Sequence, residues 1–208
     1  MLRSYRVLFV CLIAAFATPA TAATSEPDAF LKDFADRAVA SLTEEGLEQP
    51  ELAKRFGDLL EEGFDIPHIS QFVTARYWRG ASDEQKQAFY DAFRGYLIQR
   101  FLPLFGEYKG QDFETGQVRS DAGEEDVSWV MIAVELGQGG QQAQTEWKLK
   151  KNGDAGYKIQ DVKAEGTSMA ITLRDEFQTF MRRKGGLDGL IEALRRQAEK
   201  AGVATTSN

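Results

Sequence analysis

Two carboxylates in the C-terminal third of the chain, Asp161 and Glu165, are the residues best placed to do chemistry. They are four positions apart, at the end of an expected strand and in the turn after it, so they point the same way if the strand stays regular. Two carboxylates beside a bound ligand can carry out acid–base catalysis, as in ketosteroid-isomerase-like enzymes built on small α+β cones.

A structural role is the alternative for this pair. Asp161 can instead pair with Arg174, and Glu165 can accept backbone N–H bonds around Gly166. We favour the structural interpretation, because the sequence places no histidine, tyrosine or second acid close to the pair.

Other catalytic or metal-binding groups are scarce. His68 is the only histidine and follows Pro67 at an expected helix start, which favours a surface position over a role as general base. Cys11 is the only cysteine, so neither a metal site nor a Ser–His triad has the residues it needs. The glycines of 137–140 belong to an expected hairpin and not to a phosphate-binding loop. We therefore expect no metal, no cofactor and no enzymatic activity.

Residues 1–22 have the organisation of a secretory signal peptide. Arg3 and Arg6 precede an apolar run over Val7–Ala17, and the small residues of Ala20-Thr-Ala22 offer a cleavage site. The apolar run is shorter than the roughly 20 residues that span a bilayer. We expect export and a single mature domain over residues 23–203, without a disulfide because Cys11 lies in the leader.

The charge of the chain argues against nucleic acid as a partner. The full sequence has 25 basic and 32 acidic residues, a net charge of −7, and loss of Arg3 and Arg6 with the leader leaves 23 against 32, a net charge of −9. Phosphate backbones and anionic bilayers both select basic surfaces. The charge is uneven, since residues 23–65 hold 12 acids and 4 bases whereas residues 169–203 hold 7 bases and 5 acids. The acidic segment is either a solvated helical pair or a docking surface.

Hydrophobic spacing predicts an α+β fold. Apolar residues recur with helical period over 30–42, 52–63, 66–77, 82–104, 169–180 and 187–194. Residues 111–119, 127–134, 145–150 and 157–164 alternate as strands do. We expect Asp65 to cap the third helix, Ser82 with Gln85 to cap the fourth, Pro103 to kink or fray the end of the fourth, and Thr167 or Ser168 to cap the sixth. Helices wrapped around a curved antiparallel sheet of about four strands tend to enclose an apolar cavity.

Several short motifs together resemble the MlaC family, also known as the toluene-tolerance family. They are Phe64-Asp-Ile-Pro67, Tyr77-Trp-Arg79, Glu165-Gly-Thr-Ser-Met169 and Gly185-Gly-Leu-Asp-Gly-Leu190. Each motif is weak alone, but their order and spacing are specific, and the resemblance runs from about Phe30 to Leu194. Residues 112–144 depart most from the family pattern.

The resemblance implies a periplasmic lipid carrier with a nuclear-transport-factor-2-type sheet and extra helices. Such a protein holds phospholipid acyl chains in an apolar cavity and leaves the headgroup at the mouth. It is expected to be a monomer that passes lipid between an outer-membrane lipoprotein–porin complex and an inner-membrane transporter with a mammalian-cell-entry ring. A hopanoid carrier is the close alternative, and an enzyme that uses Asp161 and Glu165 is the more distant one.

Aromatic and large apolar residues are the expected lining of that cavity. Trp129 and Met131 on the sheet are expected to face Phe101 and Phe177 on the helices. The same side chains would be ordinary core in a domain without a cavity. The expected lipid-binding set is Phe72, Tyr77, Trp78, Phe93, Leu97, Phe101, Trp129, Met131, Trp147 and Phe177.

Overall fold

The computed structural model describes residues 26–105, 113–136 and 141–200. The expected signal peptide (1–22), the first two residues of the expected strand over 111–119, the glycine turn at 137–140 and the end of the expected domain (201–203) lie outside these ranges.

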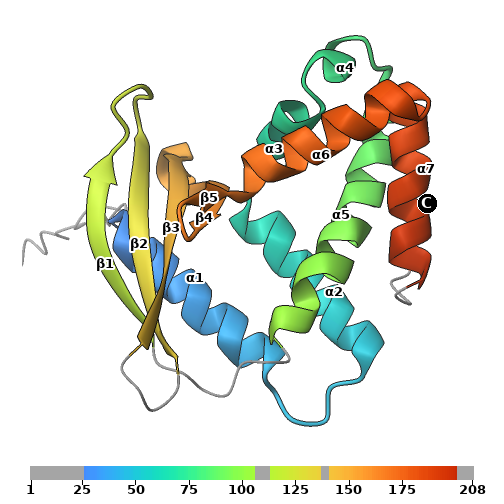
Figure 1. Ribbon diagram of the computed structural model, residues 1–208. Helices are drawn as coiled ribbons and strands as arrows, with labels where there is room; N and C mark the ends of the chain where they lie inside the picture. The colour runs from blue at the N-terminus through green and yellow to red at the C-terminus, as the bar shows by residue number, and fades with distance from the viewer. Residues whose placement is uncertain (1–25, 106–112, 137–140, 201–208) are drawn as a thin grey trace, which may run out of the picture.

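The described residues form an α+β fold, as the sequence predicts (Figure 1). The helices are α1 (Pro27–Leu42), α2 (Gln49–Gly63), α3 (Ile66–Thr74), α4 (Arg76–Arg79), α5 (Asp83–Phe105), α6 (Met169–Arg183) and α7 (Gly186–Lys200). The strands are β1 (Phe113–Ser120), β2 (Val127–Leu136), β3 (Gln141–Lys151), β4 (Tyr157–Ala164) and β5 (Thr167–Ser168), with a short 3-10 helix, η2 (Gly153–Ala155), before β4. They pair in chain order as a curved, open antiparallel sheet. The two-residue β5 adds one strand to the expected four.

One expected helix is two helices in the structure. The apolar spacing over 66–77 predicts a single helix, but α3 ends at Thr74 and α4 begins at Arg76. Ala75 lies between them with φ +50° and ψ −116°, a conformation that an L-residue with a side chain rarely adopts. The apolar spacing could not predict this break, because it reflects the positions of side chains and not the backbone angles of a single alanine.

The expected helix caps are confirmed. Asp65 Oδ1 accepts the backbone N–H of His68 at 3.2 Å, and Ser168 Oγ accepts that of Ile171 at 3.1 Å. The backbone N–H groups of Ser82 and Gln85 donate to each other's side chains in a reciprocal capping box. Pro103 lies inside α5, which continues to Phe105.

The apolar residues form two separate cores. The helical core lies among α2, α3, α5, α6 and α7, and its centre is a stack of aromatic rings from α5 and α6. The sheet core lies between α1 and one face of the sheet, which we call the inner face. Buried members of the sheet core are Leu31, Phe34, Val130, Ile132, Leu149 and Ile159.

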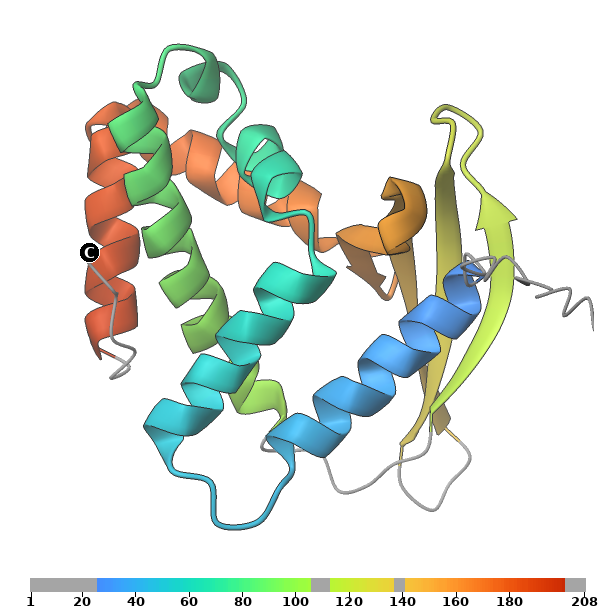
Figure 2. The ribbon, with the colours of Figure 1, turned by 180° about the vertical axis from the view of Figure 1, so that it is seen from behind.

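The two cores stand side by side with little direct packing between α5 and the sheet. The sheet is covered on its inner face by α1, whereas α5 packs on α2, α3 and α7 (Figures 1 and 2). The sheet reaches the helical layer mainly through β4, which packs on α2, α3 and α6. Leu59 and Phe64 are partly buried and pack against both cores. We call the boundary between the two cores the seam.

Candidate functional site

The turn between α2 and α3 crosses the seam and ties the two cores together. Asp65 N–H donates to the carbonyl of Ile159 at 2.8 Å, so this turn is attached directly to β4. The Phe64 ring lies 6.3 Å from the Trp147 ring on the sheet and 6.3 Å from the Phe34 ring on α1. One aromatic side chain from the helical layer therefore sits on the inner face of the sheet.

Polar groups of β4 reinforce this crossing. Lys158 Nζ donates to the carbonyls of Glu61 (2.9 Å) and Glu62 (2.6 Å), which belong to the last turn of α2 and have no helical partner. Gln160 Nε2 donates to Asp65 Oδ2 at 3.1 Å. The ammonium group of Lys158 also interacts favourably with the partial negative charge at the C-terminal end of α2.

Asp161 fastens the start of α6 to β4. Its Oδ1 accepts the backbone N–H groups of Val162 (2.8 Å) and Ala170 (2.9 Å), and its Oδ2 accepts the hydroxyl of Ser168 (2.5 Å). A carboxylate at the N-terminus of a helix also interacts favourably with the helix dipole. The expected pair with Arg174 is wrong, because that guanidinium lies 4.8 Å from the centre of the Phe72 ring instead.

Glu165 does not join Asp161 in a site. It is exposed, at the turn between β4 and β5, with φ +50°. Within the described residues its side chain makes no hydrogen bond, including the expected bonds around Gly166. Asp161 accepts three hydrogen bonds, two of them from the start of α6, and the structure does not bring the two carboxylates together in one site. His68 is exposed in the first turn of α3, as expected.

A pocket of about 560 Å³ opens at the seam, beside the α2–α3 turn. Its walls come from the end of α2, the start of α3, one side of α5, and the adjoining ends of β3 and β4. Both apolar and charged side chains line the pocket, and the charged ones include acids and bases. The lining residues are Leu60, Glu61, Phe64, Asp65, Ile66, Pro67, Gln87, Tyr90, Asp91, Arg94, Lys150, Lys151, Asn152 and Lys158.

The polar groups of this pocket are held in fixed positions. Arg94 Nε donates to Glu61 Oε1 at 2.6 Å, and its Nη2 lies 3.5 Å from Asp58 Oδ1. Burial raises the pKa of Tyr90 further above neutral pH than that of an ordinary tyrosine, and the protonated hydroxyl can donate a hydrogen bond. The rim of the pocket can therefore hold a polar or anionic group while the apolar residues contact a hydrocarbon.

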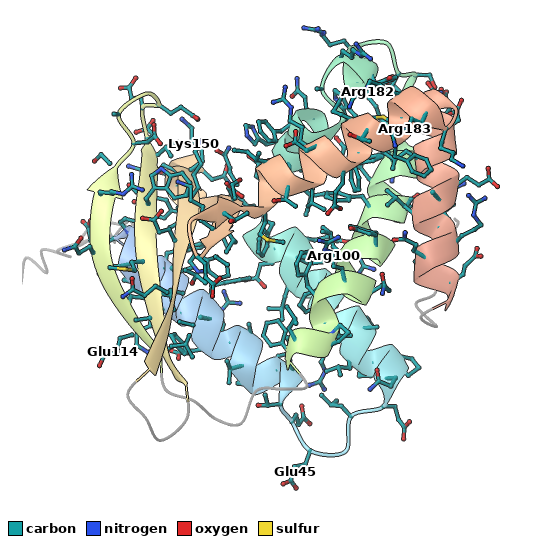
Figure 3. All side chains as sticks on the ribbon, in the orientation of Figure 1. Glu45, Arg100, Glu114, Lys150, Arg182 and Arg183 are labelled. Carbon is teal, nitrogen blue, oxygen red and sulfur yellow. The ribbon has the colours of Figure 1, made fainter. Side chains whose placement is uncertain are left out.

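Incompletely buried apolar residues lie on both sides of the seam, and Phe64 of the pocket wall contacts one of them, Trp147. On the sheet side Val130, Trp147 and Val162 are cross-strand neighbours on the inner face, and the last two are only half-buried. On the helical side Phe101 lies seven residues after Arg94, hence on the same side of α5, and is also half-buried. Arg100, next to it, donates to Tyr96 and to Glu176, and so links α5 to α6 (Figure 3).

Three of the expected lining residues lie in the closed part of the helical core. Phe93, Leu97 and Phe177 are 0%, 6% and 4% exposed. The rings of Phe93 and Phe177 are 5.9 Å apart in an edge contact. These side chains pack against one another rather than against an open space.

Trp129 and Met131 lie on the outer face of the sheet, away from α1. They pair with Lys148 and Glu146, whereas the intervening Val130 pairs with Trp147 on the inner face. Lys163 Nζ covers the Trp129 ring at 3.7 Å, and Trp129 Nε1 donates to Asp121 Oδ2 at 2.7 Å. The expectation that these two residues face Phe101 and Phe177 is wrong. Apolar residues on both faces of β2 had left open which face meets the helices.

The remaining expected residues fall in two places. Phe101 and Trp147 border the seam, as described above. Phe72, Tyr77 and Trp78 lie on α3 and α4, where Trp78 packs against Tyr90 with ring centres 5.3 Å apart. The structure thus divides the expected set among the helical core, the outer face of the sheet, α3–α4 and the seam.

Sequence reasoning missed the polar residues of the seam pocket. Tyr90, Arg94 and Lys158 carried no catalytic or metal-binding pattern, and they are distant in sequence. Phe64 and Asp65 stood inside a family motif, Phe64-Asp-Ile-Pro67, but without an assigned role. Arg94 and Lys158 likewise stood in two shorter elements that resemble the family, Phe93-Arg94 and Tyr157-Lys-Ile159. These elements were the available signal.

Within residues 26–105, 113–136 and 141–200, no group of three or more His, Cys, Asp or Glu side chains is arranged to hold a metal ion. No helix in the same ranges has the length and apolar character needed to cross a membrane.

Comparison with known proteins identifies relatives of the chain. A curated relative, the toluene tolerance protein ttg2D of Pseudomonas putida, is 26% identical over 146 residues, which make up 69% of this chain and 66% of that protein, just under two thirds of its length. A solved structure of the phospholipid-binding protein from Ralstonia solanacearum, in complex with a phospholipid, superposes with a TM-score of 0.73 at 20% identity. That match covers 86% of this chain and 99% of the other. It establishes the common fold.

The family model described as "MlaC protein" matches residues 32–196, most of the chain and nearly all of the described residues. This range agrees with the extent that the motifs predict, about Phe30 to Leu194. It includes the α2–α3 turn, the sheet and the start of α6. The chain belongs to the MlaC family.

Proposed function

We propose that this protein is a lipid carrier that holds acyl chains in the seam between its two cores. The half-buried apolar strip formed by Trp147, Val162 and Phe101 is the observation that carries this proposal. Beside it lies a pocket with apolar walls and a rim of charged groups of both signs, among them Arg94 and Lys158. The acyl chains occupy the strip, and the headgroup stays at the polar rim.

The energetics of lipid transport favour such a site. Exposing a methylene to water costs about 0.8 kcal/mol, so two chains with about 30 methylenes cost on the order of 24 kcal/mol unless they are enclosed. A pocket of about 560 Å³ has the size of a site for one small molecule. Two full chains require the seam to widen. Because α5 packs on α2, α3 and α7 and hardly on the sheet, the sheet and α5 can move apart at the seam while each core keeps its own contacts.

Phospholipid is the proposed cargo, and carriage rather than catalysis is the proposed activity. The structural relative from Ralstonia solanacearum was solved with a phospholipid, which supports this choice. The commitment of Asp161 to three structural hydrogen bonds supports a binding role. As part of the proposal, residues 1–22 direct the protein to the periplasm. There the monomer exchanges lipid with an outer-membrane lipoprotein–porin complex and an inner-membrane mammalian-cell-entry transporter.

Lipid analysis of the purified protein tests the proposal. The protein is isolated from the periplasm of its native host without detergent, analysed by native mass spectrometry, and extracted with organic solvent. We expect about one phospholipid per protein, as a mass increment that disappears on extraction. A hopanoid increment would retain the carrier and change its cargo. Protein without any extractable lipid would contradict the carrier assignment.

A further inference from the structure

A second pocket lies outside the seam, between α3–α4 and α6. Its volume is about 420 Å³, and it shares no lining residue with the seam pocket. Arginines dominate its walls. The lining residues are Gln71, Phe72, Ala75, Arg76, Arg79, Arg174 and Gln178.

The three arginines of this pocket have no carboxylate partner among the described residues. Arg174 lies over the Phe72 ring at 4.8 Å, and Arg76 over the Tyr77 ring at 5.0 Å. Stacking holds a guanidinium in place but uses none of its N–H donors. Arg76 donates one bond, to the Tyr77 hydroxyl at 3.2 Å. Most of the fifteen N–H donors are therefore free to bind an anion.

The basic residues of α1, α2 and α5 differ from these three arginines in their partners. Every Lys and Arg of α1, α2 and α5 makes an ion pair with an Asp or Glu. The chain has seven more acids than bases, so carboxylates are plentiful. Three adjacent unpaired guanidiniums in such a protein indicate a site for a negatively charged ligand.

The basic surface continues along α6 as a row. Arg174, Gln178 and Arg182 are spaced by four residues and lie on one side of the helix. At 1.5 Å per residue, the row from Arg174 to Arg182 is about 12 Å long. That length matches roughly four residues of extended peptide. Arg182 and Arg183 lie at the end of α6 that is close to α4 (Figure 3).

Contacts within the chain fix the walls of this pocket. Gln178 Nε2 donates to the carbonyls of Val73 (3.3 Å) and Thr74 (2.9 Å), the last residues of α3, and so fixes α6 against α3. Ala75, in its unusual conformation, turns the chain so that Arg76 and Arg79 border the same pocket as Arg174. A preformed site of this kind loses little conformational entropy when a ligand binds.

We propose that this pocket and its extension along α6 bind an acidic segment of a partner protein. Carboxylates of that segment would form bidentate pairs with Arg174 and Arg79, and the row to Arg182 would receive the next acidic side chains. A row suits an extended acidic peptide better than a single phosphate. A short acidic segment can enter a local pocket of this kind, whereas an anionic bilayer presents a broad surface that the net negative charge of the chain repels. The proposal concerns a separate site and stands whether or not the seam holds lipid.

Fluorescence anisotropy with labelled peptides tests the site. The probes are pentaglutamate and, as a neutral control, pentaglutamine, with the purified mature protein at low ionic strength. We expect saturable binding of pentaglutamate only. Arg174→Gln and Arg79→Gln should each weaken it about fivefold or more, and Arg174→Lys should also weaken it, because a lysine cannot form the bidentate pair. Arg195→Gln, which removes the same charge from α7, should change it less than about twofold.

Each contrary outcome overturns the proposal. Arg79 has no hydrogen bond or ion pair among the described residues, so Arg79→Gln should leave the fold intact even if Arg174→Gln does not. Equal losses in Arg195→Gln and Arg79→Gln would show a diffuse charge effect. Failure of pentaglutamate to bind the wild-type protein would exclude the acidic segment. Binding to phosphatidylglycerol vesicles through Arg79 and Arg174, without binding of pentaglutamate, would assign the site to a membrane surface instead.

Discussion

The helical core and the sheet core differ in how completely they are closed. At the centre of the helical core Phe89 and Phe93 are fully buried, and Phe177 is 4% exposed. In the sheet core Val130 and Leu149 are fully buried, but their neighbours Trp147 and Val162 remain half-buried towards the seam. The side chains at the centre of the helical core are thus buried by one another, whereas the inner face of the sheet keeps apolar side chains that are only half-buried. We therefore expect a ligand to bind at these half-buried apolar side chains.

The largest expected effect comes from breaking the closed core. Leu97→Arg places a charged side chain where Leu97 is 6% exposed, within the helical core. An unpaired charge in such a site should destabilise the protein by more than about 4 kcal/mol. Thermal unfolding followed by circular dichroism should show a protein that is unfolded or melts far below wild type. A well-folded Leu97→Arg protein would mean that this side of α5 faces an open cavity.

A smaller effect is expected at the link between the cores. Asp161→Ala removes the acceptor of three hydrogen bonds, two of which hold α6 to β4, and should cost about 2–3 kcal/mol. Asp161→Asn keeps one oxygen in place and should cost about 1 kcal/mol. Glu165→Gln is the matched control and should change the free energy of unfolding by less than about 0.5 kcal/mol, because Glu165 is exposed. Urea unfolding measures all three. A reaction on lipid that disappears in Asp161→Asn would instead reveal an enzyme.

The smallest effect concerns the backbone of the helical layer. The positive φ of Ala75 strains its backbone, and glycine would relieve this strain. Ala75→Gly should therefore stabilise the protein by about 1 kcal/mol. Ala88→Gly, inside α5, should have the opposite sign and cost about 1 kcal/mol. Melting temperatures of the two variants should therefore move in opposite directions. A lower melting temperature for Ala75→Gly would show that Ala75 is not strained.

Local patterns in the sequence predicted the elements better than their assembly. Asp65, Ser82 and Ser168 were recognisable as caps because their side chains act within three residues. The alternation in β2 was equally clear, but Trp129 and Val130 were both apolar candidates for the inner face. Only the pairing with β3 and the position of α1 decide between them, and neither is a local property.

The positions of the expected lining residues could not be predicted from the sequence. Trp147 packs beside Phe64 and Phe101 is half-buried, whereas Phe93 and Phe177 fill the closed core. An aromatic residue at helical spacing looks the same in a core and in a cavity wall. The cations of the rim, such as Lys158, could not be found from sequence, because their positions depend on the contact between β4 and the end of α2.

The lipid content of two sheet variants tests the central claim most directly. Val162→Arg introduces a long charged side chain on the inner face, at the seam, and Met131→Arg introduces the same side chain on the outer face, opposite Glu146. Both proteins are purified alike, checked for folding by circular dichroism, and extracted for mass spectrometry. We predict wild-type lipid content for Met131→Arg and a loss of most of the lipid for Val162→Arg. Full lipid content in a folded Val162→Arg protein, or loss of lipid only in Met131→Arg, would contradict a lipid site in the seam.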